Sequence, residues 1–160
     1  MSKPSNKTRA RTPRLFWRDE RGTQFVELAI VLPIMILLFA AVAEFGRYFY
    51  EYTTLAKATR VGARYLINAP VDGSKDANAK NLVVYGNQAG TGNPVINGLT
   101  TANVTITRVG GADSSQTVTV QITGYKYQPL FDLGKMINVP TLSLNIDVKP
   151  SVTMRHLLSI

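Results

Sequence analysis

The feature that most constrains this chain is one long apolar segment near its N-terminus. From Phe25 to Phe45, 13 residues are Leu, Ile, Val or Phe, and only Glu27 and Glu44 are acidic. A helix over residues 23–45 would be about 34 Å long, enough to cross a hydrocarbon core of about 30 Å. Those 13 side chains favour insertion by about 4–8 kcal/mol, whereas a carboxylate at the bilayer centre costs roughly 2.5–3.5 kcal/mol. We therefore predict a transmembrane helix.

Two other structures could contain such a segment. The uninterrupted apolar run from Leu28 to Ala43 is near the lower length limit for a span, so a buried core helix of a soluble protein stays open. A secretory signal peptide with cleavage near Ala43 also stays open, although the run is long for one. Pro33 does not argue against a membrane helix, because neighbouring groups can satisfy the carbonyl that a proline leaves unpaired.

The net charge of +8 is concentrated before the apolar segment. Residues 1–22 contain seven Lys or Arg against two acidic residues, whereas residues 23–160 contain 11 against eight. Lys and Arg directly before a membrane helix are typical of its cytoplasmic flank. A nucleic-acid-binding arm is the other interpretation, but no aromatic platform or base-reading motif accompanies the tail. We expect membrane lipid rather than nucleic acid as the partner of residues 1–22.

The helical pattern continues beyond the predicted span. Residues 46–68 contain no proline, and we expect an amphipathic stem there. Its apolar stripe recurs every three or four residues: Phe45, Tyr48, Phe49, Tyr52, Leu55, Ala56, Thr59, Ala63 and Leu66. We expect this stripe to cover the apolar face of the following domain.

Residues 69–160 predict a small extracytoplasmic α+β domain. Asp76 could cap a short helix over residues 77–85. Apolar residues then alternate with polar ones over 104–109, 118–122 and 142–148, and the period resumes after Pro150. Such half-apolar strands predict an antiparallel sheet with one buried face, and the turn between the first two strands falls in residues 110–115. The predicted fold is α+β: a long N-terminal helix packed on a small antiparallel sheet.

The sequence offers little for catalysis or for binding a cofactor. There is no cysteine, and the single histidine, His156, has no neighbour of the kind that a zinc site or a catalytic triad needs. Gly90, Gly92 and the residues around them match neither a P-loop nor a dinucleotide fingerprint. We expect no metal, no cofactor and no enzymatic activity.

The N-terminal motifs resemble a known family. A basic leader that ends in Gly22, with Glu27 at the fifth position after it and a hydrophobic helix following, is similar to the processing site of type IV prepilins. Residues 26–66 resemble the TadE-like pseudopilins of tight-adherence pili. The residues that carry this resemblance are Val26, Glu27, Leu32, Pro33, Glu44, Phe45, Gly46, Arg47, Ala58, Arg60, Gly62, Ala63, Arg64 and Tyr65. The chain departs at Leu28, where many such pilins have an aromatic residue.

The resemblance implies cleavage by a prepilin peptidase after Gly22, with Thr23 as the new N-terminus. Glycine suits that position because it lets an extended backbone enter a narrow cleft. Glu27 would then lie in the first helical turn, where it could pair with the free amine of Thr23 or of a neighbouring subunit. The alternative interpretation of Glu27 is a charge that merely reaches back to the headgroups.

Together these features predict a minor pilin, pseudopilin or assembly component of a bacterial tight-adherence pilus. We expect a single-pass inner-membrane protein with residues 1–22 in the cytoplasm and residues 69–160 in the periplasm, and incorporation into a surface pilus is compatible with this topology. The expected partners are the prepilin peptidase, other pilins and pilus assembly proteins. An unprocessed, membrane-anchored periplasmic binding protein is the alternative.

Overall fold

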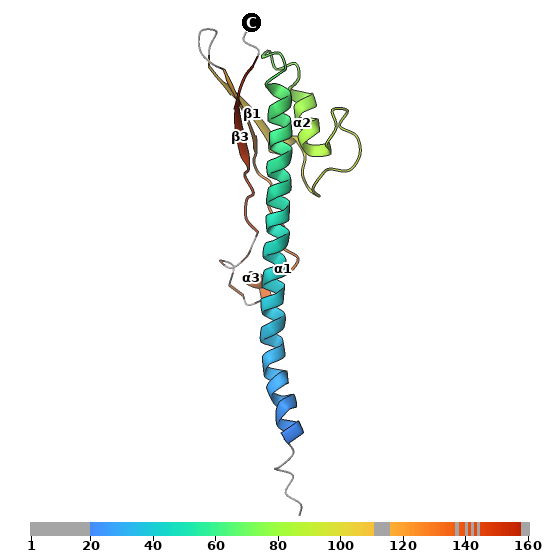
Figure 1. Cartoon of the computed structure of the whole chain (residues 1–160), viewed down its shortest axis with the longest axis vertical. Helices are drawn as coiled ribbons and strands as arrows, with labels where there is room; N and C mark the ends of the chain where they lie inside the picture. Colours follow the sequence, from blue (N-terminus) through green and yellow to red (C-terminus); the bar gives the residue numbers. More distant parts are fainter. Residues whose placement is uncertain are drawn as a thin grey trace, which may run out of the picture. The chain divides into compact units, whose positions relative to one another are not determined.

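The computed structural model describes residues 20–110, 116–136, 138–139, 141, 143 and 145–157. Its elements follow in the order α1 (Glu20–Leu66), α2 (Asp76–Tyr85), η2 (Thr101–Asn103), β1 (Val104–Val109), β2 (Thr117–Ile122), α3 (Leu133–Met136) and β3 (Ser151–Arg155) (Figure 1). The chain divides into two compact units, Met1–Phe39 and Ala40–Ile160. The long apolar helix and the three-stranded antiparallel sheet confirm the predicted α+β class.

The described part of the first unit is the beginning of α1, which is helical from Glu20. The sequence predicted a start at Thr23, so Gly22 lies inside the helix rather than before it. No proline interrupts residues 20–24, so the helical backbone can begin before Thr23. The Cβ of a larger residue at Gly22 would meet nothing within 4 Å.

By length and composition, α1 is the one helix among the described residues that could cross a membrane. Its most apolar 18-residue window has a mean hydropathy of 2.7, and none of that window is buried in the protein. The large apolar side chains from Phe25 to Phe39 are exposed. A core helix of a soluble protein would instead be largely buried, so the structure gives no support to that alternative.

The sheet of the second unit has the strand order β1-β2-β3, and both pairs are antiparallel. Val118, Val120 and Ile122 of β2 are at most 1% exposed, which confirms the predicted alternation. The opposite face is polar, and the hydroxyls of Thr119 and Thr153 lie 2.8 Å apart across the strands. One face of the sheet therefore carries the core.

The third strand differs from the sequence prediction. Within the described part of residues 142–148 there is a single isolated bridge, between Lys126 and Asp147, and β3 begins only at Ser151. Pro150 has no N–H for a ladder, but its carbonyl accepts a hydrogen bond from the Ile122 N–H (3.0 Å). Pro150 indicates either an edge strand or a bulge, and the structure has the edge strand, because β3 pairs with β2 alone.

The end of β1 also differs from the sequence prediction. Val109, which the sequence analysis placed with the apolar residues of this strand, is 64% exposed. Arg108 is the partly buried residue there, because a strict period of two from Val104 places it on the inner face. The predicted turn at 110–115 falls outside the described residues except for Gly110.

The short helix α2 was predicted correctly, but the role of Asp76 was not. Asp76 is the first helical residue, and the position before it, Lys75, makes no side-chain capping bond. The Asp76 carboxylate instead accepts hydrogen bonds from Arg108 of β1. Gly86 ends the helix in the left-handed conformation at φ 71°, where glycine has no steric penalty.

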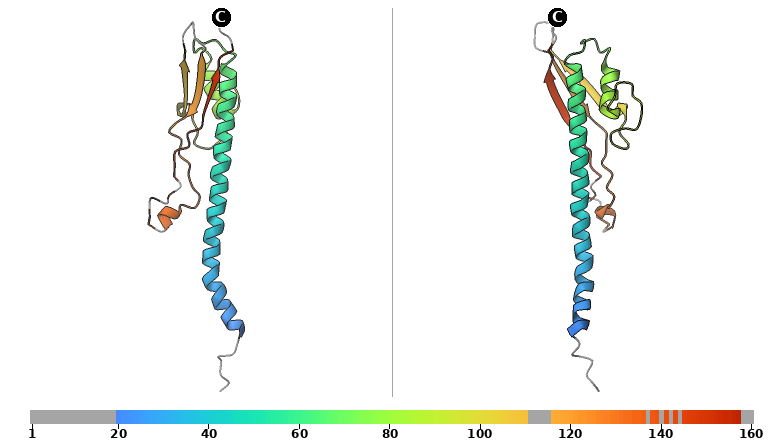
Figure 2. Two further views of the ribbon diagram at one scale, coloured as in Figure 1. Left: turned by 60° about the vertical axis from the view of Figure 1, so that its left-hand side comes forward. Right: turned by 45° about the vertical axis from the view of Figure 1, so that its right-hand side comes forward.

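The second half of α1 packs with α2 and the sheet around one core (Figure 2). Leu55, Ala63 and Leu66 are at most 1% exposed, as the predicted stripe required. The beginning of that stripe was wrong: Phe45 and Phe49 are 60% and 67% exposed. At this level the side of α1 that carries Glu44 faces the rest of the domain, since Glu44 is buried while Phe45 and Phe49 are exposed.

Glycine at position 62 permits the close approach of α1 and α2. A Cβ at Gly62 would lie 2.5 Å from Cγ2 of Val83, with the carbonyl of Ala79 at 3.6 Å. Val83 is fully buried, and a valine in a helix has one strongly preferred rotamer, so its side chain cannot turn away from an added Cβ. Gly46 lies in the same helix, but a Cβ there would meet no atom within 4 Å.

We expect Gly62→Val to lower the free energy of unfolding by about 2 kcal/mol, since overpacking a core costs typically 1–3 kcal/mol. The measurement is urea titration of the full chain in detergent micelles. Gly46→Val is the matched control and should change stability by no more than about 0.5 kcal/mol. Restoring space with Val83→Ala should recover part of the loss, and equal effects of the two valines would contradict the packing role of Gly62.

Candidate functional site

The most unusual side chain of the second unit is Glu44, an acidic residue that is 1% exposed. Its carboxylate accepts hydrogen bonds from the Tyr127 hydroxyl (2.5 Å), from the Leu130 N–H (2.9 Å) and from the Phe131 N–H (3.3 Å). A buried carboxylate is very costly unless such donors replace water. Here both oxygens are used, and two of the donors belong to the backbone of one short segment.

The chain after β2 is extended, and this places those donors along α1. Tyr125 and Tyr127 alternate with the exposed Lys126 and Gln128, so both phenols point to the same side. The Tyr127 N–H donates to the Ile146 carbonyl (3.0 Å), and the Val148 N–H donates to the Tyr125 carbonyl (2.9 Å). This pairing carries the segment past the end of the regular sheet, where its donors reach Glu44.

A second carboxylate lies two turns further along α1. Glu51 accepts a hydrogen bond from the Tyr125 hydroxyl (3.0 Å). Burial raises the pKa of both Tyr125 and Tyr127, and the neighbouring Glu51 and Glu44 carboxylates raise it further. The phenols therefore remain protonated at neutral pH and act as donors. Tyr48 packs edge-on against Tyr127 at 5.4 Å between ring centroids, between the two acidic residues.

Beside these contacts runs a groove of about 930 Å³. It lies between α1 and the segments 95–98 and 124–128, and Gly46, Arg47, Glu51 and Lys126 line it. Its charges have both signs, so it selects no ligand by charge alone. Within the described ranges, no group of three or more His, Asp or Glu side chains is placed to hold a metal ion.

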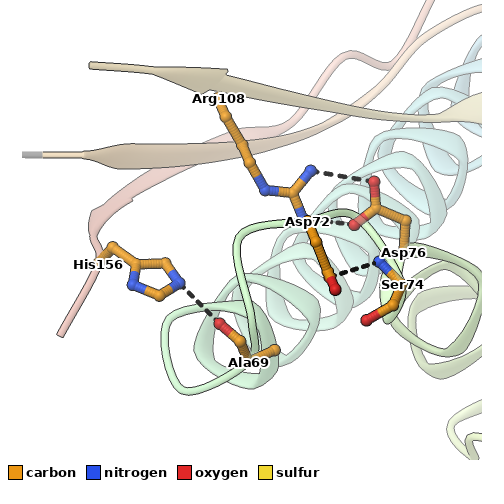
Figure 3. A network of polar contacts seen from close by, with 6 residues as sticks. All are labelled: Ala69, Asp72, Ser74, Asp76, Arg108 and His156. Carbon is orange, nitrogen blue, oxygen red and sulfur yellow. Dashed lines mark hydrogen bonds and ion pairs between the residues drawn. The ribbon is translucent and has the colours of Figure 1, made fainter. Parts of the chain in front are cut away.

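A separate polar network joins the elements around the C-terminal end of α1 (Figure 3). Arg108 of β1 pairs with Asp76 of α2 through both of its terminal nitrogens. Nε2 of His156 lies 2.9 Å from the Ala69 carbonyl oxygen, just after α1. Because these residues lie in four different segments and contact one another or the backbone, the network serves the fold rather than a ligand.

The family motif of the sequence separates into buried and exposed residues. Glu44, Gly62 and Ala63 are buried and hold α2 and the 125–131 segment against α1. The exposed members are Pro33, Phe45, Gly46, Arg47, Arg60 and Arg64, and Tyr65 is half-buried. Part of this motif therefore has a structural explanation, and the exposed part faces outward.

The predicted processing residues lie together at the start of α1. Gly22, Thr23 and Glu27 are all exposed and helical. Thr23 and Glu27 are four residues apart, which places them on the same face of the helix. Their roles in processing and charge pairing remain predictions.

Sequence reasoning missed the partners of Glu44. It identified Glu44 as a motif residue but assigned it no contact, and it did not single out Tyr125 or Tyr127. Two tyrosines with a period of two after Gly124 could have indicated an extended segment with one aromatic face. Nothing in the sequence indicates that this face meets α1 more than 70 positions earlier.

These observations define an α+β protein with one helix whose exposed apolar half is compatible with a single-pass membrane anchor. Residues 22–64 match the model of the TadE family, described as TadE-like protein. The chain is TadE-like over this segment, which confirms the resemblance seen in the sequence and indicates a protein associated with a tight-adherence pilus. No curated protein and no solved structure matches the chain.

We expect Glu44→Ala to release the 128–136 segment, because it leaves the Leu130 and Phe131 N–H groups without their acceptor and removes the shorter of the two hydrogen bonds of the Tyr127 hydroxyl. Stability should fall by at least about 2 kcal/mol, and trypsin should cut faster after Lys135, whose side chain is 83% exposed. The measurement is limited proteolysis of the full chain in detergent. Glu51→Ala removes one phenol contact only and is the control. Unchanged cleavage after Lys135 would contradict this role of Glu44.

Proposed function

We propose that this chain is a minor pilin, pseudopilin or assembly component of a bacterial tight-adherence pilus, processed by a prepilin peptidase after Gly22. The observation that carries the proposal is the family match, which begins at Gly22 and continues to Arg64. It covers nearly all of α1 and little else. The role is therefore attributed to the helix, and we propose a structural rather than a catalytic function.

The arrangement along α1 supports insertion of its N-terminal part in the inner membrane. The apolar side chains there are exposed, and seven basic residues precede them. By the positive-inside rule this end remains in the cytoplasm, which directs the sheet domain to the periplasm. Pilins and pilus assembly proteins are the partners that this topology makes accessible.

Glu27 supplies the proposed specificity of assembly. Cleavage after Gly22 would create an α-amine at Thr23, one helical turn before the Glu27 carboxylate. In a low-dielectric surrounding an exposed carboxylate on an apolar helix gains most by meeting a cation. The amine of the same subunit or of a neighbour is such a cation, and the neighbour's amine would fix the register between two helices.

Processing is tested first by determining the N-terminus of the protein recovered from cells. We expect Thr23 for the native chain and Met1 for Gly22→Val, because a branched side chain cannot follow the backbone into a narrow peptidase cleft. Gly46→Val introduces the same change at another open position of α1 and should retain the Thr23 start.

Two other N-termini would contradict the proposal. Met1 on the native protein would favour an unprocessed membrane-anchored periplasmic binding protein. A start at Glu44 would favour a secreted domain released by signal peptidase.

Glu27→Ala tests the pairing. We expect the variant to be cleaved normally, since the cut lies five residues earlier, but to form few or no surface pili. The measurements are the N-terminus and the amount of pilus sheared from the cells, with Glu20→Ala as a control in the segment that cleavage removes. Normal pili from Glu27→Ala would exclude the pairing role while leaving the processing site intact.

A further inference from the structure

The residues held by Glu44 carry two large apolar side chains that the protein itself does not cover. Leu130 is 69% exposed and Phe131 is 46% exposed, although the N–H groups of both are bound by the buried carboxylate. The backbone of this pair is thus fixed while its side chains face outward. Fixed and exposed apolar side chains indicate a surface that contacts something apolar.

The depth of this pair along α1 is known from its hydrogen bonds. The predicted span ends at Phe45, one residue beyond Glu44. Side chains of a helix tilt toward its N-terminus, so the Glu44 carboxylate lies toward the span from its own Cα. The two amides that bind it are 2.9 and 3.3 Å away. Leu130 and Phe131 therefore lie beside the residue at which the predicted span ends.

Exposed aromatic residues of α1 lie close to the same level. Phe45, Phe49 and Tyr50 are each at least 60% exposed and lie within two turns after Glu44. Tyr and Trp concentrate at the membrane–water interface, and Phe and Leu enter the boundary between headgroups and acyl chains on interfacial segments. The helix and the 130–131 pair thus present side chains that suit this boundary.

The charges around the pair fit a lipid surface as well. Asp132 is turned inward, where its carboxylate accepts hydrogen bonds from the Lys135 N–H (3.2 Å) and the Ser143 hydroxyl (3.1 Å). The Lys135 ammonium is largely exposed, with its Nζ 3.8 Å from that carboxylate. An apolar pair flanked by an outward cation can enter the headgroup layer and meet anionic lipid.

We propose that Leu130 and Phe131 form a second membrane contact, entering the headgroup region of the leaflet from which α1 emerges, with Glu44 holding their backbone at that depth. This inference rests on the proposed insertion of α1. It adds a lipid-binding surface to the domain that follows the span, so that the domain is fixed to the bilayer at two points.

The absence of cysteine from the chain allows a direct test. Single-cysteine variants of the full chain carry an environment-sensitive fluorophore and are reconstituted at low density in vesicles of phosphatidylcholine and phosphatidylglycerol. Leu130→Cys reports on the proposed contact. Val109→Cys is the matched control, because Val109 is 64% exposed and is the last residue of β1. Val31→Cys reports on the span itself.

We expect the Leu130 label to emit at shorter wavelength than the Val109 label. Nitroxide groups carried near the lipid headgroups should quench the Leu130 label severalfold more strongly than the Val109 label. Aqueous iodide should quench the Val109 label more strongly than the Leu130 label. Adding Glu44→Ala should reduce the nitroxide quenching at position 130.

Three results would overturn the inference. Equal quenching at positions 130 and 109 would show that the pair remains in water. A Leu130 label that neither iodide nor nitroxide lipid reaches would show that another protein copy covers it. If the Val31 label is also unquenched by nitroxides deep in the bilayer, insertion of α1 fails together with the inference, which separates that outcome from the first two.

Discussion

The second unit depends on one buried carboxylate. Glu44 lies where the apolar part of α1 meets its polar stem, and its side chain is the only buried acid among the described residues. Leaving that charge without donors would be far more costly than any single apolar contact nearby, so the fold must bring donors to it. The donors come from residues 127–131, and the whole extended segment after β2 follows α1 to supply them. A charge in the helix thus determines the path of a chain segment more than 80 residues away.

The same helix serves different surroundings along its length. Its first part exposes apolar side chains, and its last part buries small residues against α2 and the sheet. Between them, one side binds the 125–131 segment and the other exposes Phe45 and Phe49. One continuous helix makes all of these contacts, and the proposed processing site and the proposed pairing residue Glu27 lie on the same helix. The family match, residues 22–64, also lies within α1.

Under the proposed insertion of α1, the contacts around Glu44 would connect the membrane anchor with the segment that follows β2. A helix alone fixes the depth of its own residues, whereas the hydrogen bonds to Leu130 and Phe131 extend that constraint to the following domain. Two membrane contacts at one depth would restrict tilting of the domain more than a single helix can, which gives the exposed apolar pair a function.

The sequence by itself determined the elements that local patterns specify. The apolar run and the stripe that follows it predicted α1, the period of two predicted β1 and β2, and Asp76 as a possible cap predicted a short helix over residues 77–85. Each of these signals arises from side chains that are close in the chain, so no knowledge of distant contacts is needed. The separation of Gly22 from Glu27 and the motif around Glu44 were sufficient to indicate the TadE-like resemblance.

Only the tertiary structure decided which face of the stem is buried, where the third strand begins and what Glu44 does. An apolar stripe containing Phe45 and Phe49 looks like a buried face when only nearby residues are considered. In the structure the buried side of α1 is instead the side that carries Glu44, because residues 127–131 supply hydrogen-bond donors to its carboxylate. The third strand covers residues 151–155, after Pro150, which has no N–H for the ladder. Alternation alone does not define a strand, because the strand must also pair with β2. Such choices depend on contacts between residues far apart in sequence, and those contacts are absent from any local pattern.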